Sequence, residues 1–177
     1  MQATVAYIAL GANLGDRPAA LQAAVHGLAA HDKVEGIRAS PVYEAEAHTL
    51  TPDDVQPPYL NAVVEVITTL TPEALLAYCR RLEQAAGRTR GRAWAPRTLD
   101  LDLLAFGSWK RHTPGLNLPH LRLGVRRFVL QPWADLAPNF YVPTPYDATV
   151  ADLLRRCPDA DDLVRTEHRL LKPFNPT

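Results

Sequence analysis

Residues 96–104 read PRTLDLDLL, and this stretch decides both the fold and the chemistry expected of the chain. Leucine and aspartate alternate through it, which is the pattern of a β-strand with one buried face. The leucines are therefore predicted to face the core, and Asp100 and Asp102 to share the opposite face. Two carboxylates so close on one strand repel each other unless a cation lies between them. The stretch predicts a strand that carries a cation site.

The segment that leads into this strand is rich in arginine. Cations are favourable at helix C-termini, so Arg80 and Arg81 are explained by a helix that ends nearby. Arg97 is not explained in this way, because it lies three residues before Asp100 at the start of the strand. One guanidinium group binds two phosphate oxygens at once, and carboxylates bind Mg²⁺. The combination predicts a magnesium and polyphosphate site; the alternative is a half-exposed strand that follows a solvated basic loop.

Hydrophobic periodicity and turn residues predict the order β-α-β-β-α-β for the first part of the chain. This order is typical of the ferredoxin-like α+β fold, an antiparallel sheet with both helices on one face. We expect the strand with the two aspartates to pair beside the first strand, centrally in the sheet. The predicted strands are 4–10, 34–43, 59–69 and 99–106, and the predicted helices are 17–30 and 71–86.

Residues 107–177 are predicted to form a proline-rich C-terminal extension, so residues 1–177 are expected to be a single domain. The acids that follow Pro158 indicate a helix and then a frayed terminus. The other elements expected in the extension are a short helix near 126–131, a strand near Phe140 and a helix at about 149–156.

Composition excludes several classes of protein. The chain has 19 basic and 19 acidic residues and no net charge, so its charge balance does not favour nucleic acid. Cys79 and Cys157 are isolated and fit neither a disulfide framework nor a metal cluster. The N-terminal residues lack the features of a signal peptide, and no stretch approaches the ~20 apolar residues of a membrane span. We expect a cytoplasmic monomer with no nucleic-acid or membrane partner.

Two irregular loops are predicted to be functional because they are longer than most connections. The first covers residues 44–58, and the second covers residues 88–98. Trp94 lies in the second loop. It either packs in the core or closes over a planar substrate.

Three further residues carry groups that suit a flat, phosphorylated substrate. His120 has arginines nearby in the sequence and is able to donate to a phosphate oxygen. Tyr59 and Asn61 share one face of a strand and would suit a flat heterocycle with an amide-like edge. An ordinary structural histidine and an ordinary cross-strand contact are the alternatives.

A second class of function is a nucleic-acid-binding module of the same fold. Such modules present aromatic side chains on their central strands for base stacking. Here the strand at 99–106 presents acids, which would repel a phosphate backbone. The nucleotide-binding patterns GxxxxGKS/T and GxGxxG are absent from the sequence, so a P-loop enzyme is excluded.

Taken together, the motifs resemble those of the hydroxymethyl-dihydropterin pyrophosphokinase family, over nearly the whole chain. The most specific block is RTLDLD at 97–102 with its Trp-x-Pro-Arg lead-in. The supporting blocks are YIALGANL at 7–14, YLNA at 59–62, residues 83–88, Pro119-His120 and residues 126–128.

The resemblance implies transfer of the β,γ-pyrophosphoryl group of ATP to the hydroxymethyl group of the dihydropterin. It implies that Asp100 and Asp102 hold two Mg²⁺ ions, and that both substrates are small molecules. Tyr59 and Phe128 would sandwich the pterin while Asn61 reads its amide edge. The residues implied in ATP binding are Glu83, Arg88, Arg97, His120 and Arg126, and those implied in catalysis are Arg88, Trp94, Arg97, Asp100 and Asp102.

Some positions depart from the family pattern. The loop that is usually rich in threonine, proline and glycine reads EAEAHTLTP at 44–52, so its pterin contacts cannot be transferred to this chain. Leu121 stands where an aromatic residue is common, and Ala95 where a glycine often follows the loop tryptophan. A catalytically inactive relative is the alternative, but both acids, Arg97 and His120 are retained.

Overall fold

The structure is a computed structural model, and it describes residues 2–87 and 96–171. The predicted order of elements is confirmed, except that the second strand is divided into two short strands that both pair with the next long strand. Pro41, which has no N–H to give to a ladder, lies at the division. The elements are β1 (Thr4–Ala12), α1 (Arg17–Ala29), β2 (Val34–Ala39), β3 (Tyr43–Ala45), β4 (Tyr59–Thr68), α2 (Pro72–Ala85) and β5 (Asp100–Phe106).

The main sheet is antiparallel and has the strand order β10-β3-β4-β1-β5, with β2 also paired to β4. The predicted pairing of β5 with β1 is confirmed, but its predicted central position is wrong, because β5 is the last strand in this order. The helical connection from β1 leads to β2 on the far side of β4, and the helical connection from β4 leads to β5 on the far side of β1. Strands β1 and β4 therefore occupy the centre of the sheet. The strand with the two aspartates is therefore an edge strand.

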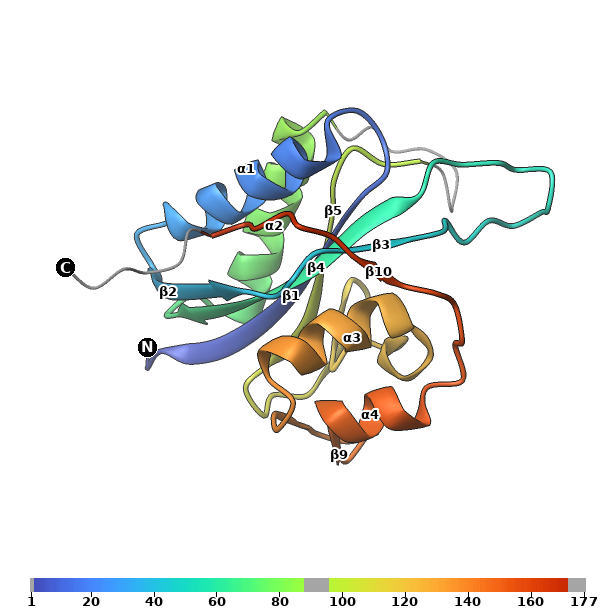
Figure 1. The fold of residues 1–177 in the computed structure, drawn as a ribbon. Helices are drawn as coiled ribbons and strands as arrows, with labels where there is room; N and C mark the ends of the chain where they lie inside the picture. Colours follow the sequence, from blue (N-terminus) through green and yellow to red (C-terminus); the bar gives the residue numbers. More distant parts are fainter. Residues whose placement is uncertain (1, 88–95, 172–177) are drawn as a thin grey trace.

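The sheet is covered on both faces, as Figure 1 shows. Helices α1 and α2 lie on one face, as predicted, and the extension places α3 (Arg127–Leu136) and α4 (Val150–Arg156) on the other. Side chains of β1 alternate between the two layers: Ile8 and Leu10 pack with α1 and α2, whereas Tyr7 and Ala9 pack with α3 and α4. The two aspartates of β5 lie on the α3 side.

The extension contains the predicted helices and a strand close to Phe140, together with elements that the sequence pattern does not indicate. The helix predicted after Pro158 is wrong, because residues 157–163 are irregular and lead into β10. The Asp159 carboxylate accepts a hydrogen bond from the Asp161 N–H, and such local bonds compete with a helix. The predicted strand close to Phe140 is β8 (Tyr141–Val142). The unpredicted elements are β6 (Arg111–Thr113), β7 (Leu116–Leu118), a 3₁₀ turn (Leu123–Val125), β9 (Ala148–Thr149) and β10 (Val164–Arg165).

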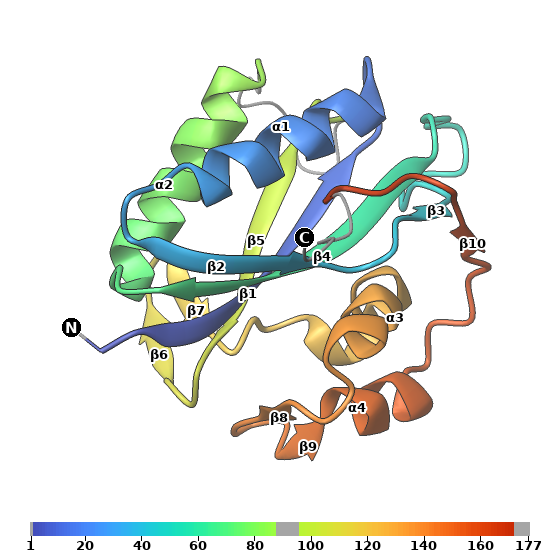
Figure 2. The ribbon, with the colours of Figure 1, turned by 60° about the vertical axis from the view of Figure 1, so that its left-hand side comes forward.

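Strand β10 brings the C-terminal segment back to the main sheet. Val164 lies opposite Glu44 and Arg165 opposite Tyr43, so this segment adds a strand beside β3 (Figure 2). Among the described residues, no helix combines the length and the hydrophobicity that crossing a membrane requires.

An ionic cluster, buried at Glu65 and Tyr7 and exposed at Arg38, connects three strands on the α3 side of the sheet. Arg38, Glu65 and Tyr7 lie in one row across β2, β4 and β1. The Glu65 carboxylate accepts two hydrogen bonds from the Arg38 guanidinium, at 2.9 and 2.8 Å, and one of 2.8 Å from the Tyr7 hydroxyl. The hydrogen bonds from Arg38 are the main reason that the pKa of Glu65 is lowered.

We predict that Glu65→Ala destabilises the protein by about 2–4 kcal/mol at pH 7, because it leaves the buried Tyr7 hydroxyl without its acceptor. Since the pKa of Glu65 is lowered in the folded state, its contribution is present above the ordinary carboxyl pKa and is lost as pH falls through the lowered value. Urea unfolding at pH 7 and in acid measures the difference. The exposed Glu35 of β2 supplies the control, Glu35→Ala, and a loss at pH 7 no larger than in this control would contradict the prediction.

Candidate active site

The candidate site lies at one end of the sheet, where three strands place polar residues in one row. Asn61 of β4 lies opposite Gly11 of β1, and Gly11 lies opposite Asp100 of β5. Asp102 is opposite Ala9 in the next row on the same face. A Cβ at Gly11 would lie 3.5 Å from both the Asn61 Oδ1 and the Tyr59 ring, so glycine leaves the floor of the site open. The predicted common face of Asp100 and Asp102 is thus also the face of Tyr59 and Asn61.

Two cavities meet at the aspartates. The first, of about 320 Å³, is bounded by β1, β4, the 46–58 loop and the start of α3, and Tyr59, Asn61 and Phe128 line it. The second, of about 400 Å³, lies between α2, β5 and the segment before α3, and Glu83 and His120 line it. The residues that line both cavities are Arg97, Asp100, Asp102, Arg122 and Arg126. Two carboxylates and three guanidinium groups therefore form the wall between the cavities.

The two aspartates have arginine partners of unequal quality. Arg97 Nη1 lies 2.9 Å from Asp100 Oδ1, but Arg126 Nη1 lies 3.6 Å from Asp102 Oδ2, which is too long for a good hydrogen bond. Burial, followed by the charge of Asp100, raises the pKa of Asp102 to about 6. The negative charge of Asp102 is therefore only partly compensated by nearby arginines. Hard carboxylate oxygens facing a cavity are ligands that fit Mg²⁺, which keeps water or phosphate oxygens in its other positions.

Glu83 of α2 supports β5 from the side. It is a buried residue, and its Oε1 accepts a hydrogen bond of 2.8 Å from the N–H of Leu101, between the two aspartates. Because β5 is an edge strand, this N–H points away from β1 and would otherwise lack a strand partner. Glu83 lines the second cavity, as its predicted role requires, and its observed bond also positions the strand.

His120 is held in a single tautomer by its backbone surroundings. The backbone N–H of His120 donates to the Leu104 carbonyl oxygen at 2.9 Å, and the backbone carbonyl oxygen of His120 accepts from the Tyr146 hydroxyl at 2.7 Å. The ring Nδ1 accepts from the Arg122 N–H at 3.2 Å, so the proton lies on Nε2. Burial, followed by the charges of Arg126 and Arg122, lowers the pKa of His120 to about 4. The ring is neutral near pH 7 and offers an N–H donor.

Asn13 is an important residue that the sequence analysis did not single out. It is almost fully buried and exchanges two hydrogen bonds with the backbone of Arg97: the Arg97 N–H donates to Oδ1 at 2.8 Å, and the Asn13 N–H donates to the Arg97 carbonyl at 3.0 Å. Its Nδ2 donates to the Pro57 carbonyl oxygen at 3.1 Å and lies 3.4 Å from Gln56 Oε1. An asparagine in a glycine-rich turn directly after a strand was the available signal.

The aromatic wall of the first cavity comes from separate parts of the chain. Tyr59 begins β4 and Phe128 lies in the first turn of α3, and both line the cavity beside Asn61. The Arg126 guanidinium lies 5.8 Å from the Phe128 ring centroid. Arg88 and Trp94, for which catalytic roles are predicted, lie outside the residues that the structure describes.

The chain is similar to proteins of one family. The family model described as 7,8-dihydro-6-hydroxymethylpterin-pyrophosphokinase matches residues 7–138. A 2-amino-4-hydroxy-6-hydroxymethyldihydropteridine pyrophosphokinase of Pseudomonas aeruginosa is 38% identical over 152 residues, which are 86% of this chain and 91% of that protein. A protein of the same name from Bacillus subtilis is 41% identical over 132 residues, covering 75% of this chain and 77% of the relative.

Solved structures agree on the fold. The wild-type HPPK-DHPS of Plasmodium falciparum with pteroate superimposes with a TM-score of 0.67 at 13% identity, over 88% of this chain. The present chain spans 44% of that longer chain. At this identity the likeness concerns the fold alone.

We predict that Asp102→Asn stabilises the metal-free protein at pH 8. The folded-state pKa of Asp102 is raised from its ordinary value of 3.8 to about 6, so the folded protein binds its proton more tightly and loses stability as pH rises through this interval. In EDTA, the variant should exceed the wild type at pH 8 by on the order of 1 kcal/mol, and by less at pH 4, because Asp102 is partly exposed. Urea unfolding at both pH values measures this, with the exposed Asp32→Asn as control. A variant that is no more stable than the wild type at pH 8 would exclude the charge conflict.

Proposed function

Because the chain belongs to the 7,8-dihydro-6-hydroxymethylpterin-pyrophosphokinase family, we propose that its two cavities bind the two substrates of that activity. The enzyme transfers the pyrophosphoryl group of ATP to the hydroxymethyl group of the dihydropterin, in folate biosynthesis. One observation carries the assignment of the site. A wall of carboxylates and guanidinium groups separates the two cavities, so a hydroxyl bound in one and phosphates bound in the other would meet at this wall.

The pterin is assigned to the first cavity. Tyr59 and Phe128 offer two aromatic faces for a flat ring, and the buried Asn61 offers an amide with both donors and acceptors. The cavity ends at Asp100 and Asp102, so the hydroxymethyl group of a ring bound here would point at the shared wall. This orientation is the one that transfer requires.

ATP is assigned to the second cavity. The Nε2–H of neutral His120 is a donor for a phosphate oxygen, and Arg97, Arg122 and Arg126 supply positive charge at the side of the first cavity. By similarity to the family, Arg88 would add a further phosphate contact and Glu83 would also lie against ATP. Reactions of this kind depend on positioning and charge neutralisation more than on covalent chemistry.

Magnesium is assigned to Asp100 and Asp102, and by similarity to the family two ions would bind there. The metal supplies charge neutralisation for the phosphate oxygens. With the carboxylates engaged in this way, Arg97 and Arg126 would be released from their aspartate partners and could turn to the phosphates. Trp94 is proposed to lie on a loop that closes over the site and excludes water, which competes with the hydroxyl as acceptor.

We also propose that the extension and the sheet act as one catalytic domain. The extension contributes His120, Arg126 and Phe128 to the cavities, while β1, β4, β5, α2 and the 46–58 loop contribute other walls. The monomeric state and the cytoplasmic location stay predictions.

The proposed reaction is tested by the nucleotide that it releases. Purified protein with ATP, Mg²⁺ and hydroxymethyl-dihydropterin should form AMP only when the pterin is present, and EDTA should stop it. Asp102→Ala should lower turnover by more than about 10²-fold while the protein stays folded, because the aspartate lies on a polar face and its charge is costly there. Chromatography of the nucleotides and circular dichroism measure these outcomes. ADP as the product, or full activity of the variant, would contradict the proposal.

Arg97 is predicted to act on the chemical step. Arg97→Ala should lower kcat by about 10²-fold and change the KM for ATP by less than about threefold, because charge develops at the phosphates in the transition state. Steady-state kinetics with ATP varied at saturating pterin separates the two constants. Arg111→Ala is the matched control, since Arg111 pairs with Glu73 outside both cavities. Equal losses in binding and turnover would make Arg97 a simple binding residue.

A further inference from the structure

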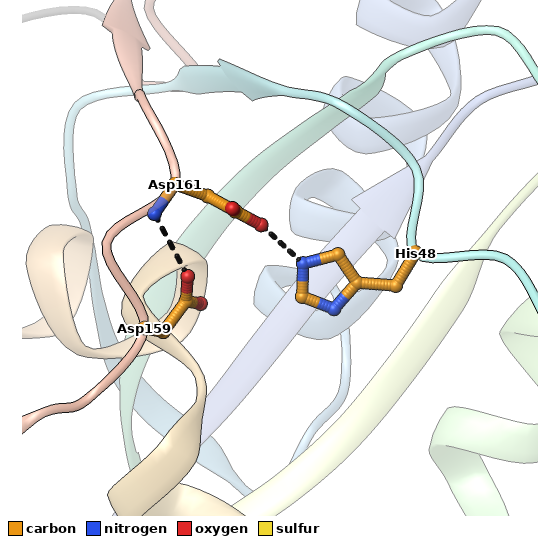
Figure 3. Close-up of side chains that lie close together, drawn as sticks. All are labelled: His48, Asp159 and Asp161. Carbon is orange, nitrogen blue, oxygen red and sulfur yellow. Dashed lines mark hydrogen bonds and ion pairs between the residues drawn. The ribbon is translucent and has the colours of Figure 1, made fainter. Parts of the chain in front are cut away.

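His48 is a wall residue of the first cavity that the family resemblance does not account for. It comes from the 46–58 loop, which departs from the family pattern, and its ring meets the Phe128 ring edge to face, with centroids 5.4 Å apart at 85°. Its Nε2 lies 2.6 Å from Asp161 Oδ2, a contact that joins the loop to the C-terminal segment (Figure 3). The sequence separation of these two residues is 113.

The contact continues from Asp161 back to Phe128. The Asp161 N–H donates to Asp159 Oδ1 at 3.0 Å, and Asp159 Oδ2 accepts from the N–H of Arg127 at 3.0 Å. Arg127 is the first residue of α3 and directly precedes Phe128. The contacts therefore form a closed ring. It runs from Phe128 to His48, Asp161 and Asp159, and back through the N–H of Arg127.

The C-terminal segment that carries Asp159 and Asp161 is itself anchored to the sheet. Directly after it, β10 pairs with β3, and both the N–H and the hydroxyl of Thr166 donate to the Val42 carbonyl oxygen at 2.9 Å. Strand β3 ends at the start of the loop that carries His48. The C-terminal segment thus holds both ends of the His48–Phe128 contact relative to the sheet.

We propose that the His48–Asp161–Asp159 cluster is a positioning device for the pterin. It fixes the ring of Phe128 and holds the 46–58 loop against the first cavity, so it sets the affinity for the flat substrate and leaves ATP binding unaffected. The identity of that substrate rests on the proposed function. The cluster lies on the side of the first cavity, and none of its residues lines the second.

A metal ion is the competing interpretation of these three residues. One ligand atom from each lies within 4.8 Å of the others, and an imidazole with two carboxylates suits a divalent transition metal. However, His48 and Asp161 already bond directly, and both oxygens of Asp159 accept backbone N–H groups. A shared ion would have to displace the direct His48–Asp161 bond, so the geometry favours the hydrogen bond between the two side chains.

The test compares Asp161→Ala with Asp32→Ala, which removes the partner of another histidine, His31, away from both cavities. Asp161→Ala should raise the KM for the pterin about two- to fivefold, the range that a partly exposed imidazole–carboxylate pair supports. The KM for ATP and kcat should change by less than twofold, and Asp32→Ala should change none of the three. Adding His48→Ala to Asp161→Ala should cause little further loss, because both remove one interaction.

Results that contradict the proposal are distinct from failure of the proposed function. Equal effects on both substrates, additive losses, or an unchanged pterin KM in an active enzyme would overturn the positioning role. Absence of pterin-dependent AMP formation in the wild type would overturn the proposed function and the substrate named here. Amide hydrogen exchange of residues 46–58 without substrates tests the contact independently. The exchange should quicken in Asp161→Ala and stay unchanged in Asp32→Ala. Tight binding of Zn²⁺ by the wild type, lost in Asp161→Ala, would overturn the positioning role in favour of a metal site.

Discussion

Repulsion between Asp100 and Asp102 is the constraint around which the end of the sheet is arranged. Both carboxylates project from one face of an edge strand, and burial together with the charge of Asp100 raises the pKa of Asp102. Glu83 holds the backbone between them by accepting a hydrogen bond from the Leu101 N–H. Arg97 and Arg126 reduce the repulsion only in part. The cation proposed to bind here would relieve this repulsion.

The extension turns this charged face into two compartments. Its helices cover the sheet beside the aspartates, and the buried Trp133 packs with Tyr7 in the layer that they form. The segment before α3 delivers His120 to one cavity and Arg126 to the wall between the two, and the first turn of α3 delivers Phe128 to the other cavity. A sheet with helices on a single face would leave the aspartates open to water, where charged substrates are held less firmly. The second layer is therefore part of the chemistry as well as of the core.

Much of the fold could be predicted because its determinants are local. Alternating leucines and aspartates placed Asp100 and Asp102 on one face, and a threonine followed by proline predicted the start of α2, where Thr71 accepts from the Ala74 N–H. The edge position of β5 could not be predicted from its own residues, since it depends on where the helical crossovers place β5 relative to the other strands. The polar helix predicted after Pro158 was wrong because the carboxylates of that segment bond to nearby backbone instead. Asn13 was overlooked for the opposite reason, because its partners lie 43 or more residues away.

The sequence by itself determined the order of the elements, the chemistry of the RTLDLD strand and the resemblance to one family of enzymes, since periodicity and motifs act over a few neighbouring residues. Only the tertiary structure decided what those residues meet. It placed the aspartates between two cavities, fixed the tautomer of His120 through the Arg122 N–H, and joined His48 to Asp161 across the chain. These contacts depend on strand register and on the return of the C-terminal segment to β3. Packing of distant segments sets both, and no local pattern records it.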